Sequence, residues 1–216
     1  MEQRENESIK TGTTTVGIQF ENGTVLATER RASMGYQVKS KKAQKVYEID
    51  DKLAITTAGS VGDTQAIVRY MKARTNMFKY KRDREMAPNS AATMLSNMLQ
   101  GSKMMPYLGM FLLGGYDTKE ERGHVFCIDP SGGNLEEDSY YATGSGSQVA
   151  YGILQDGFKE DMSEEDAVEL ALRAIRSASE RDMASGDGFS VMVIGEDGCE
   201  RLEDDDVEAR LEKIRE

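Results

Sequence analysis

The sequence predicts an α+β fold in which two antiparallel sheets stack face to face and helices cover their outer sides. The main observation is the order of elements, which runs strands, two helices, strands, two helices and strands. Blocks of strands joined by pairs of helices favour stacked sheets over an alternating parallel array. We find no internal repeat and no linker, so residues 13–216 are expected to form a single domain.

The first strands form a hairpin close to the N-terminus. Residues 14–20 roughly alternate polar and apolar side chains, which is typical of a strand. Asn22-Gly23 follows, the strongest short hairpin signal, and residues 24–29 return as the second strand. Two further strands are expected at residues 45–49 and 53–57.

Helix signals follow the first strands. Ser60, with Asp63 three residues later, resembles a capping arrangement at the start of a long helix. Pro88 suits the first turn of a second helix. Ser163 and the three acidic residues after it predict the start of another helix, over 163–183. The remaining expected elements are strands at 110–115, 124–128, 139–142, 189–194 and 200–202, a helix at 148–158 and a short charged helix from Asp205.

Composition excludes several classes of protein. The net charge of −11 argues against nucleic-acid binding through phosphate neutralisation. No apolar run approaches the roughly 20 residues that a membrane span needs. The N-terminus is polar and acidic, unlike a secretory signal, so we expect a cytoplasmic protein that does not bind membranes.

The sequence gives no reason to expect a metal or cofactor. Cys127 and Cys199 are far apart and belong to no zinc-binding pattern. His124 is the only histidine, and its position at a strand start is most consistent with a structural role. The loop around Ser145 lacks the spacing of a phosphate-binding motif. A hydroxyl nucleophile therefore needs a base other than histidine.

The stretch KTGTTTVGI, residues 10–18, offers such a base. If the chain began at Thr13, its α-amino group would titrate near 7.7–8.0, about the range in which it can accept a proton from the hydroxyl of the same residue. Gly12 has no side chain, so its carbonyl can approach the Thr13 hydroxyl closely. Self-cleavage of the Gly12–Thr13 bond would expose the amine and make residues 1–12 a propeptide.

Further motifs along the chain support this interpretation. The segments are GTTTVGI at 12–18, ATERRAS at 27–33, TAGSVGD at 57–63, TGSGS at 143–147 and ERDMASG at 180–186. Their identity and order resemble those of proteasome β-type subunits, a family of threonine peptidases and N-terminal-nucleophile hydrolases. The resemblance implies a four-layer αββα sandwich, in agreement with the element order.

The resemblance also implies roles for individual residues. Thr13 would be the nucleophile, Lys45 and Glu29 a pair beside it, and the Gly59 N–H the oxyanion donor. Many family members have aspartate where Glu29 stands, and glutamate is a variation that the family shows. Ser145, Asp182 and Ser185 would complete the polar surroundings of the Thr13 amine. Ala32, Ser33, Ala43, Thr57 and Val61 would line the substrate pocket, and because they are uncharged we expect neutral and apolar side chains to be preferred.

The function implied is that of a threonine endopeptidase, the catalytic β subunit of a proteasome core particle. The implied partners are homo-heptameric β rings stacked with rings of α subunits, an ATPase regulatory complex, and unfolded polypeptides as substrates. Two alternatives remain open at this point, a non-catalytic ring or assembly subunit and a different N-terminal-nucleophile amidohydrolase.

Overall fold

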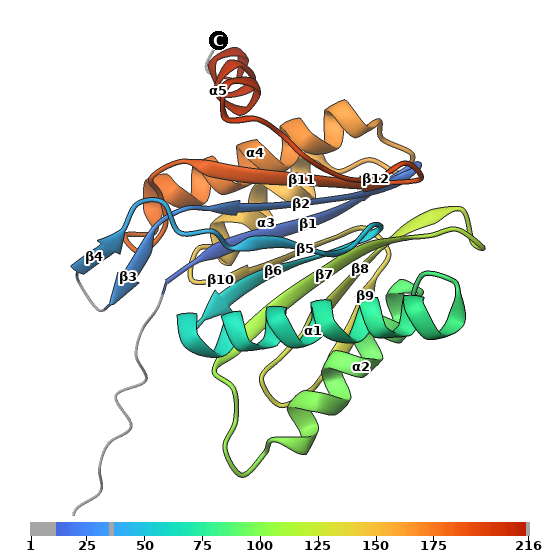
Figure 1. The fold of residues 1–216 in the computed structure, drawn as a ribbon. Helices are drawn as coiled ribbons and strands as arrows, with labels where there is room; N and C mark the ends of the chain where they lie inside the picture. The colour runs from blue at the N-terminus through green and yellow to red at the C-terminus, as the bar shows by residue number, and fades with distance from the viewer. Residues whose placement is uncertain (1–11, 35–36, 215–216) are drawn as a thin grey trace, which may run out of the picture.

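A computed structural model describes residues 12–34 and 37–214, and a five-stranded antiparallel sheet forms one half of its centre (Figure 1). The propeptide expected at residues 1–12 lies outside the described residues except for Gly12. The strands of this first sheet are β1 (Thr14–Phe20), β2 (Gly23–Glu29), β10 (Tyr140–Gly144), β11 (Phe189–Gly195) and β12 (Gly198–Arg201). They lie in the order β10-β1-β2-β11-β12, so the N-terminal hairpin expected from Asn22-Gly23 is central in the sheet.

The second sheet also has five antiparallel strands. These are β5 (Val46–Asp50), β6 (Leu53–Gly59), β7 (Gly109–Asp117), β8 (Arg122–Ile128) and β9 (Asn134–Glu137), which pair in chain order. A separate small hairpin joins β3 (Ala32–Met34) to β4 (Gln37–Ser40). The sequence did not predict β3, β4 or β9, because these short strands lack a clear apolar alternation.

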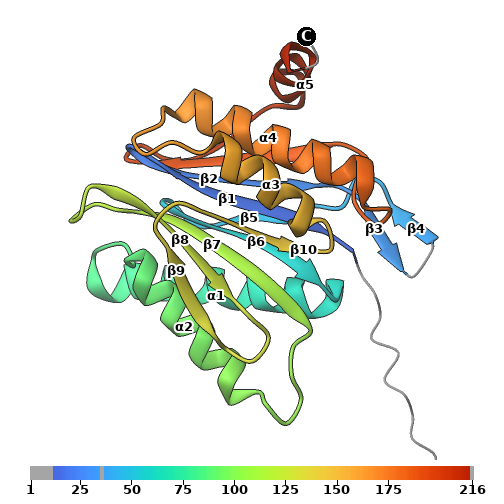
Figure 2. The same ribbon diagram turned by 180° about the vertical axis from the view of Figure 1, so that it is seen from behind.

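Helices cover the outer face of each sheet. They are α1 (Val61–Arg82), α2 (Pro88–Gly101), α3 (Ser147–Gly157), α4 (Glu164–Arg181) and α5 (Asp204–Lys213). Both views show α1 and α2 on the second sheet and α3 and α4 on the first (Figures 1 and 2). The expected four-layer αββα order is confirmed. None of the helices in the described part of the chain is long and apolar enough to cross a membrane.

All three helix starts predicted from local signals are confirmed, and α1 begins at Val61 with Ser60 as its N-cap residue. Pro88 is the first residue of α2, and the Ser163 hydroxyl accepts a hydrogen bond from the Asp166 N–H at 3.1 Å. The capping arrangement at Ser60 is wrong, because its side chain makes no capping hydrogen bond. Asp63 instead accepts from the Leu108 N–H at 3.0 Å and so tethers the loop that leads into β7.

Strand alternation in β1 determines which way Thr13 faces. Val16, Ile18 and Phe20 pack in the apolar core beneath α3 and α4. Gly17 faces the other sheet, where a Cβ on it would lie 3.0 Å from a methyl group of Val125. Thr13 precedes Gly17 by an even number of residues, so the alternation directs its side chain into the space between the sheets.

Candidate active site

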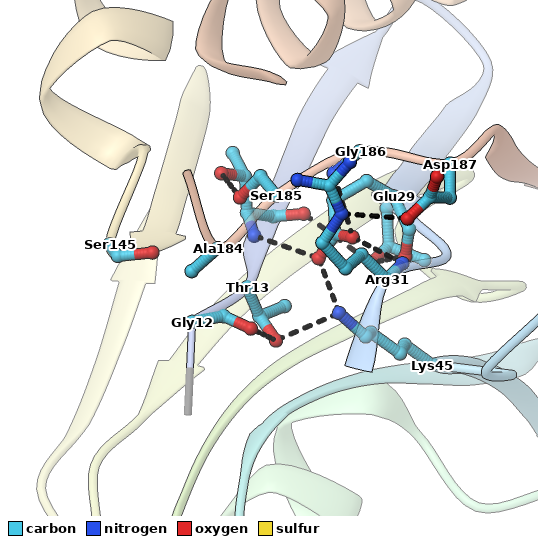
Figure 3. A network of polar contacts seen from close by, with 12 residues as sticks. Gly12, Thr13, Glu29, Arg31, Lys45, Ser145, Ala184, Ser185, Gly186 and Asp187 are labelled. Atoms are coloured by element: carbon cyan, nitrogen blue, oxygen red, sulfur yellow. Dashed lines mark hydrogen bonds and ion pairs between the residues drawn. The ribbon is translucent and has the colours of Figure 1, made fainter. Parts of the chain in front are cut away.

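The Thr13 hydroxyl lies between two groups that bear on its reactivity (Figure 3). Thr13 is only 4% exposed and stands immediately before β1. Its Oγ1 donates a hydrogen bond to the Gly12 carbonyl at 2.7 Å and accepts one from Lys45 Nζ at 2.9 Å. The hydroxyl thus touches both the carbonyl of the peptide bond before it and a possible proton acceptor.

Lys45 reaches Thr13 from the second sheet. It immediately precedes β5, and its carbonyl accepts from the Thr57 N–H of β6 at 2.8 Å, which fixes its backbone. Its ammonium group also pairs with the carboxylate of Glu29, at the end of β2 in the first sheet. The Lys45–Glu29 pair therefore bridges the two sheets beside the hydroxyl.

Backbone donors hold the Glu29 carboxylate in place. It accepts from the N–H groups of Thr14 at 3.3 Å, Arg31 at 2.6 Å and Gly186 at 3.2 Å. These donors come from three separate segments, and Glu29 is fully buried. A carboxylate fixed in this way can orient the Lys45 ammonium group.

Burial acts on both members of the pair. Removal from water lowers the pKa of Lys45 below that of a free lysine, although the Glu29 charge opposes the shift. Burial likewise raises the pKa of Glu29, opposed by Lys45 and by the backbone N–H groups. A lysine with a lowered pKa accepts a proton more readily near neutral pH than one on the surface.

Asp182, Ser185 and Ser145 form a second polar group next to the first. The Asp182 carboxylate accepts from the Ser185 hydroxyl at 2.7 Å and from the Ser145 hydroxyl. Ser185 is linked to the strand through a 2.8 Å hydrogen bond with the Thr14 hydroxyl. We assigned Thr14 only a strand role from the sequence, since nothing in a run of three threonines distinguishes the one that contacts Ser185.

Gly12 and Gly59 occupy positions where a side chain does not fit. A Cβ on Gly12 would lie 1.7 Å from the Ala184 Cβ and 3.0 Å from the Ser145 hydroxyl. Gly59 ends β6 with φ of +130°, and a Cβ there would lie 2.3 Å from the Leu108 carbonyl oxygen. Gly59 and Thr13 line the same pocket.

The sequence interpretation missed the contribution of Arg31. Its Nε pairs with Asp187 at 2.7 Å, and its Nη1 donates to the Met183 carbonyl at 2.8 Å. Arg31 therefore braces the loop that supplies Ser185 and the Gly186 N–H. Because these partners lie more than 150 positions away, no local signal in the sequence indicates the contact.

A pocket of about 780 Å³ opens beside Thr13. All five residues expected to contact substrate line it, namely Ala32, Ser33, Ala43, Thr57 and Val61. The described part of the lining is not uncharged, however, because it includes five basic side chains and no acidic one. The basic residues are Lys39, Lys42, Lys45, Arg69 and Lys72.

Comparisons with known proteins place this chain in one family. The family described as "Proteasome subunit" matches residues 9–194. A relative from Methanocaldococcus jannaschii named "Proteasome subunit beta" is 47% identical over 204 residues, covering 94% of this chain and 91% of the relative. Proteins of the same name from Methanocorpusculum labreanum and Ferroglobus placidus are 46% and 45% identical, over 96% and 97% of this chain and 97% and 99% of their own lengths.

Proposed function

This chain belongs to the proteasome subunit family as a β-type subunit, and we propose that it is a threonine endopeptidase activated by its own cleavage. The observation that carries the proposal is the position of the Thr13 hydroxyl between the Gly12 carbonyl and Lys45. In this arrangement Thr13 is the nucleophile, and residues 1–12 are a propeptide.

The first reaction is the removal of the propeptide. With Lys45 in its neutral form, Thr13 Oγ1 attacks the Gly12 carbonyl carbon while its proton passes to Lys45 Nζ. The C–N bond then breaks, the released amine takes up a proton, and Gly12 remains joined to Thr13 as an ester. Water hydrolyses the ester, which leaves a carboxylate on Gly12 and restores the Thr13 hydroxyl beside a free α-amino group.

Peptide hydrolysis uses the group that the first reaction exposes. The free amine accepts the hydroxyl proton as Thr13 Oγ1 attacks the substrate carbonyl, and later delivers it to the leaving amine. The Gly59 N–H would stabilise the oxyanion, a role in which one donor is typically worth about 10²–10³ in rate. Asp182, Ser185 and Ser145 would position the amine and its attacking water.

The pocket beside Thr13 defines the substrate preference. Small side chains such as Ala32 and Ala43 leave room for the substrate side chain on the acyl side of the cleaved bond. From the sequence we expected the pocket to prefer neutral and apolar substrate side chains. The basic lining changes this expectation, because positive charges disfavour basic substrate side chains and tolerate acidic ones. We therefore infer a preference for neutral and acidic residues over basic ones.

Family membership places the chain in the rings of a proteasome core particle. We propose in addition that seven copies form each β ring, that rings of α subunits stack on them, and that an ATPase complex in the cytoplasm delivers unfolded polypeptides. These features are carried over from the resemblance to the family.

The test is the intact mass of this chain after co-expression with the α subunit from the same source, together with hydrolysis of a fluorogenic peptide. We expect loss of residues 1–12 and activity in the wild type, and neither in Thr13→Ala rings. The control is Thr15→Val, which alters a buried hydroxyl that has no hydrogen-bond partner within the described structure.

Other outcomes would favour the alternatives. Wild-type rings that retain residues 1–12 and hydrolyse no peptide would indicate a non-catalytic assembly subunit. Activity on small amides without ring formation would indicate a different N-terminal-nucleophile amidohydrolase. Processing that persists in Thr13→Ala would exclude Thr13 as the nucleophile.

A further inference from the structure

A second cluster of titratable side chains lies at the opposite end of the sheets from Thr13. It occupies the hairpin between β7 and β8, which packs beside the β1–β2 turn. The Gly23 carbonyl oxygen lies within 2.1 Å of where a Cβ on Gly123 would be, so the two turns touch. In this hairpin Asp117, Glu120 and His124 each offer one ligand atom, and these atoms lie within 4.8 Å of one another.

His124 is the unusual member of this cluster. It is 4% exposed, and its Nδ1 lies 2.7 Å from a carboxylate oxygen of Glu136 on β9. A carboxylate can only accept, so Nδ1 carries the proton and a neutral His124 presents its lone pair at Nε2. Nε2 has no hydrogen-bond partner among the described residues.

The free nitrogen faces an acid rather than a donor. A carboxylate oxygen of Glu120 lies 3.4 Å from Nε2, which is longer than a good hydrogen bond. A lone pair and a carboxylate repel each other unless a proton or a metal cation lies between them. Two ligand atoms of a tetrahedral zinc ion are about 3.4 Å apart when each bond is about 2.1 Å long.

We infer that Asp117, Glu120 and His124 bind a divalent transition-metal cation of the zinc type at the tip of this hairpin. One imidazole nitrogen and two carboxylate oxygens suit such an ion, and water can complete the coordination. Glu136 supports His124 from behind, as carboxylates commonly do for metal-bound histidines. The cation clamps the β7–β8 hairpin, because its ligands come from both strands and from the turn between them.

The surrounding charges are compatible with this site. Arg122 pairs with Glu120 at 3.0 Å and also lies 3.7 Å from Glu136 and 3.8 Å from Asp138. When Glu120 turns to the cation, Arg122 retains its other two partners. Asp117 is held by backbone N–H groups at one oxygen, Oδ1, so its second oxygen remains available.

The experiment is a Zn²⁺ titration of the metal-stripped full-length chain, read by equilibrium dialysis and by the thermal unfolding midpoint. We expect one high-affinity Zn²⁺ per chain, and a midpoint that rises with Zn²⁺ because the ion binds the folded state. Co²⁺ provides a second probe, through the visible absorption of a tetrahedral N/O site.

The variants separate this site from other zinc-binding groups. Glu120→Gln alters an exposed side chain and is expected to weaken Zn²⁺ binding about tenfold or more, as is Glu136→Gln. The matched control is Glu121→Gln, which removes a neighbouring acid that is outside the cluster. His124→Gln should abolish the site, but the proposal does not depend on that buried variant folding.

Two results would overturn the inference. One is the absence of any stoichiometric Zn²⁺ bound by the wild type, with no change in its unfolding midpoint. The other is equal Zn²⁺ affinity in Glu120→Gln and Glu121→Gln. In either case the cluster is not a metal site, and His124 links β8 to β9 only through its contact with Glu136.

Discussion

The two ends of the sheet sandwich each bury a nitrogen base beside carboxylates, but they use it differently. At one end Lys45 contacts both Glu29 and the Thr13 hydroxyl. At the other end His124 contacts Glu136 through one nitrogen, and the second nitrogen has no hydrogen-bond partner in the described structure. Lys45 already contacts a reactive group of the chain, the Thr13 hydroxyl. His124 instead keeps one nitrogen available, and we propose that this nitrogen binds a metal ion.

The surroundings of the two bases explain this difference. Glu29 accepts the backbone N–H groups of Thr14, Arg31 and Gly186 and pairs with Lys45, so the Lys45 end is fixed by both sheets and by the loop after α4. The His124 cluster draws its proposed ligands from a single hairpin, in which Glu120 is exposed. Catalysis requires preorganised groups, whereas an ion site tolerates exposed ligands that move to meet the ion.

Of the variants that test this comparison between the two ends, substitution of Lys45 is expected to change the processing rate most. Lys45→Met keeps much of the side-chain length but removes the proton acceptor and leaves Glu29 buried without its cation. We expect processing to slow about 10²–10⁴-fold, measured as the rate of loss of residues 1–12 by mass spectrometry. Lys42→Met on the same pocket is the matched control, and Glu136→Gln at the other end should leave processing unchanged.

The comparison would fail if these variants behaved alike. A Lys45→Met chain that is processed at the wild-type rate would show that the contact with Thr13 has no part in the reaction. Slowed processing in Glu136→Gln would show that the two ends are coupled.

A smaller but sharp effect is expected at Gly12. A Cβ there collides with Ala184, so Gly12→Ala should displace the carbonyl from the Thr13 hydroxyl and slow processing about 10²-fold. Ala184→Gly removes the colliding atom, and the double variant should recover much of the rate. No recovery in the double variant would mean that glycine is needed here for its backbone freedom rather than for space.

The pH dependence of processing reports the titration of Lys45 alone, because the α-amino group of Thr13 does not exist before the Gly12–Thr13 bond is cut. Burial lowers the pKa of Lys45, so the neutral, proton-accepting fraction is larger at a given pH than for a free lysine. The processing rate should therefore rise with pH and level off below the ordinary lysine value of about 10.4.

Substitution of Glu29 tests the direction in which the pH dependence of the processing rate shifts. Its charge raises the pKa of Lys45, so Glu29→Gln should move the rise in processing rate to lower pH. Glu48→Gln, which alters an exposed acid on β5, serves as the control. A shift to higher pH in Glu29→Gln would contradict the assignment of Lys45 as the titrating group.

The smallest expected effect concerns substrate charge. The five basic side chains of the pocket should give peptides with glutamate on the acyl side a kcat/KM about two- to fivefold higher than peptides with lysine. Added salt should reduce the ratio, since all of these side chains except Lys45 are exposed. Arg69→Glu should lower the ratio and Lys81→Glu, outside the pocket lining, should not; equal effects would assign the preference to net charge alone.

Local signals predicted most of the fold but few of the contacts. Pro88 and Ser163 mark helix starts because each acts on backbone groups within a few residues. Ser60 is the N-cap residue of α1 but makes no side-chain capping hydrogen bond, and the Asp63 carboxylate accepts instead from the loop before β7, which is distant in sequence. The short strands β3, β4 and β9 were missed for a related reason, since pairing with a neighbour rather than apolar alternation defines them.

In the candidate site, too, the sequence indicated residues but not their contacts. The motifs indicated Thr13, Glu29 and Lys45 as a group, but only the structure shows a hydroxyl–ammonium distance of 2.9 Å between them. Thr14 and Arg31 carried no signal of their contacts with Ser185 and Asp187, because each partner lies more than 150 positions away.

The sequence by itself determined the layered fold and the position of Gly12 before Thr13, immediately ahead of β1. Hydrophobic periodicity and turn chemistry act over a few residues, so they can be recognised without the tertiary structure. The tertiary structure decided how closely Lys45 approaches the Thr13 hydroxyl and which basic side chains line the pocket. It also decided that ligand atoms of Asp117, Glu120 and His124 lie close together. Those features depend on strand register and on the packing of one sheet against the other, which bring together side chains that are remote along the chain.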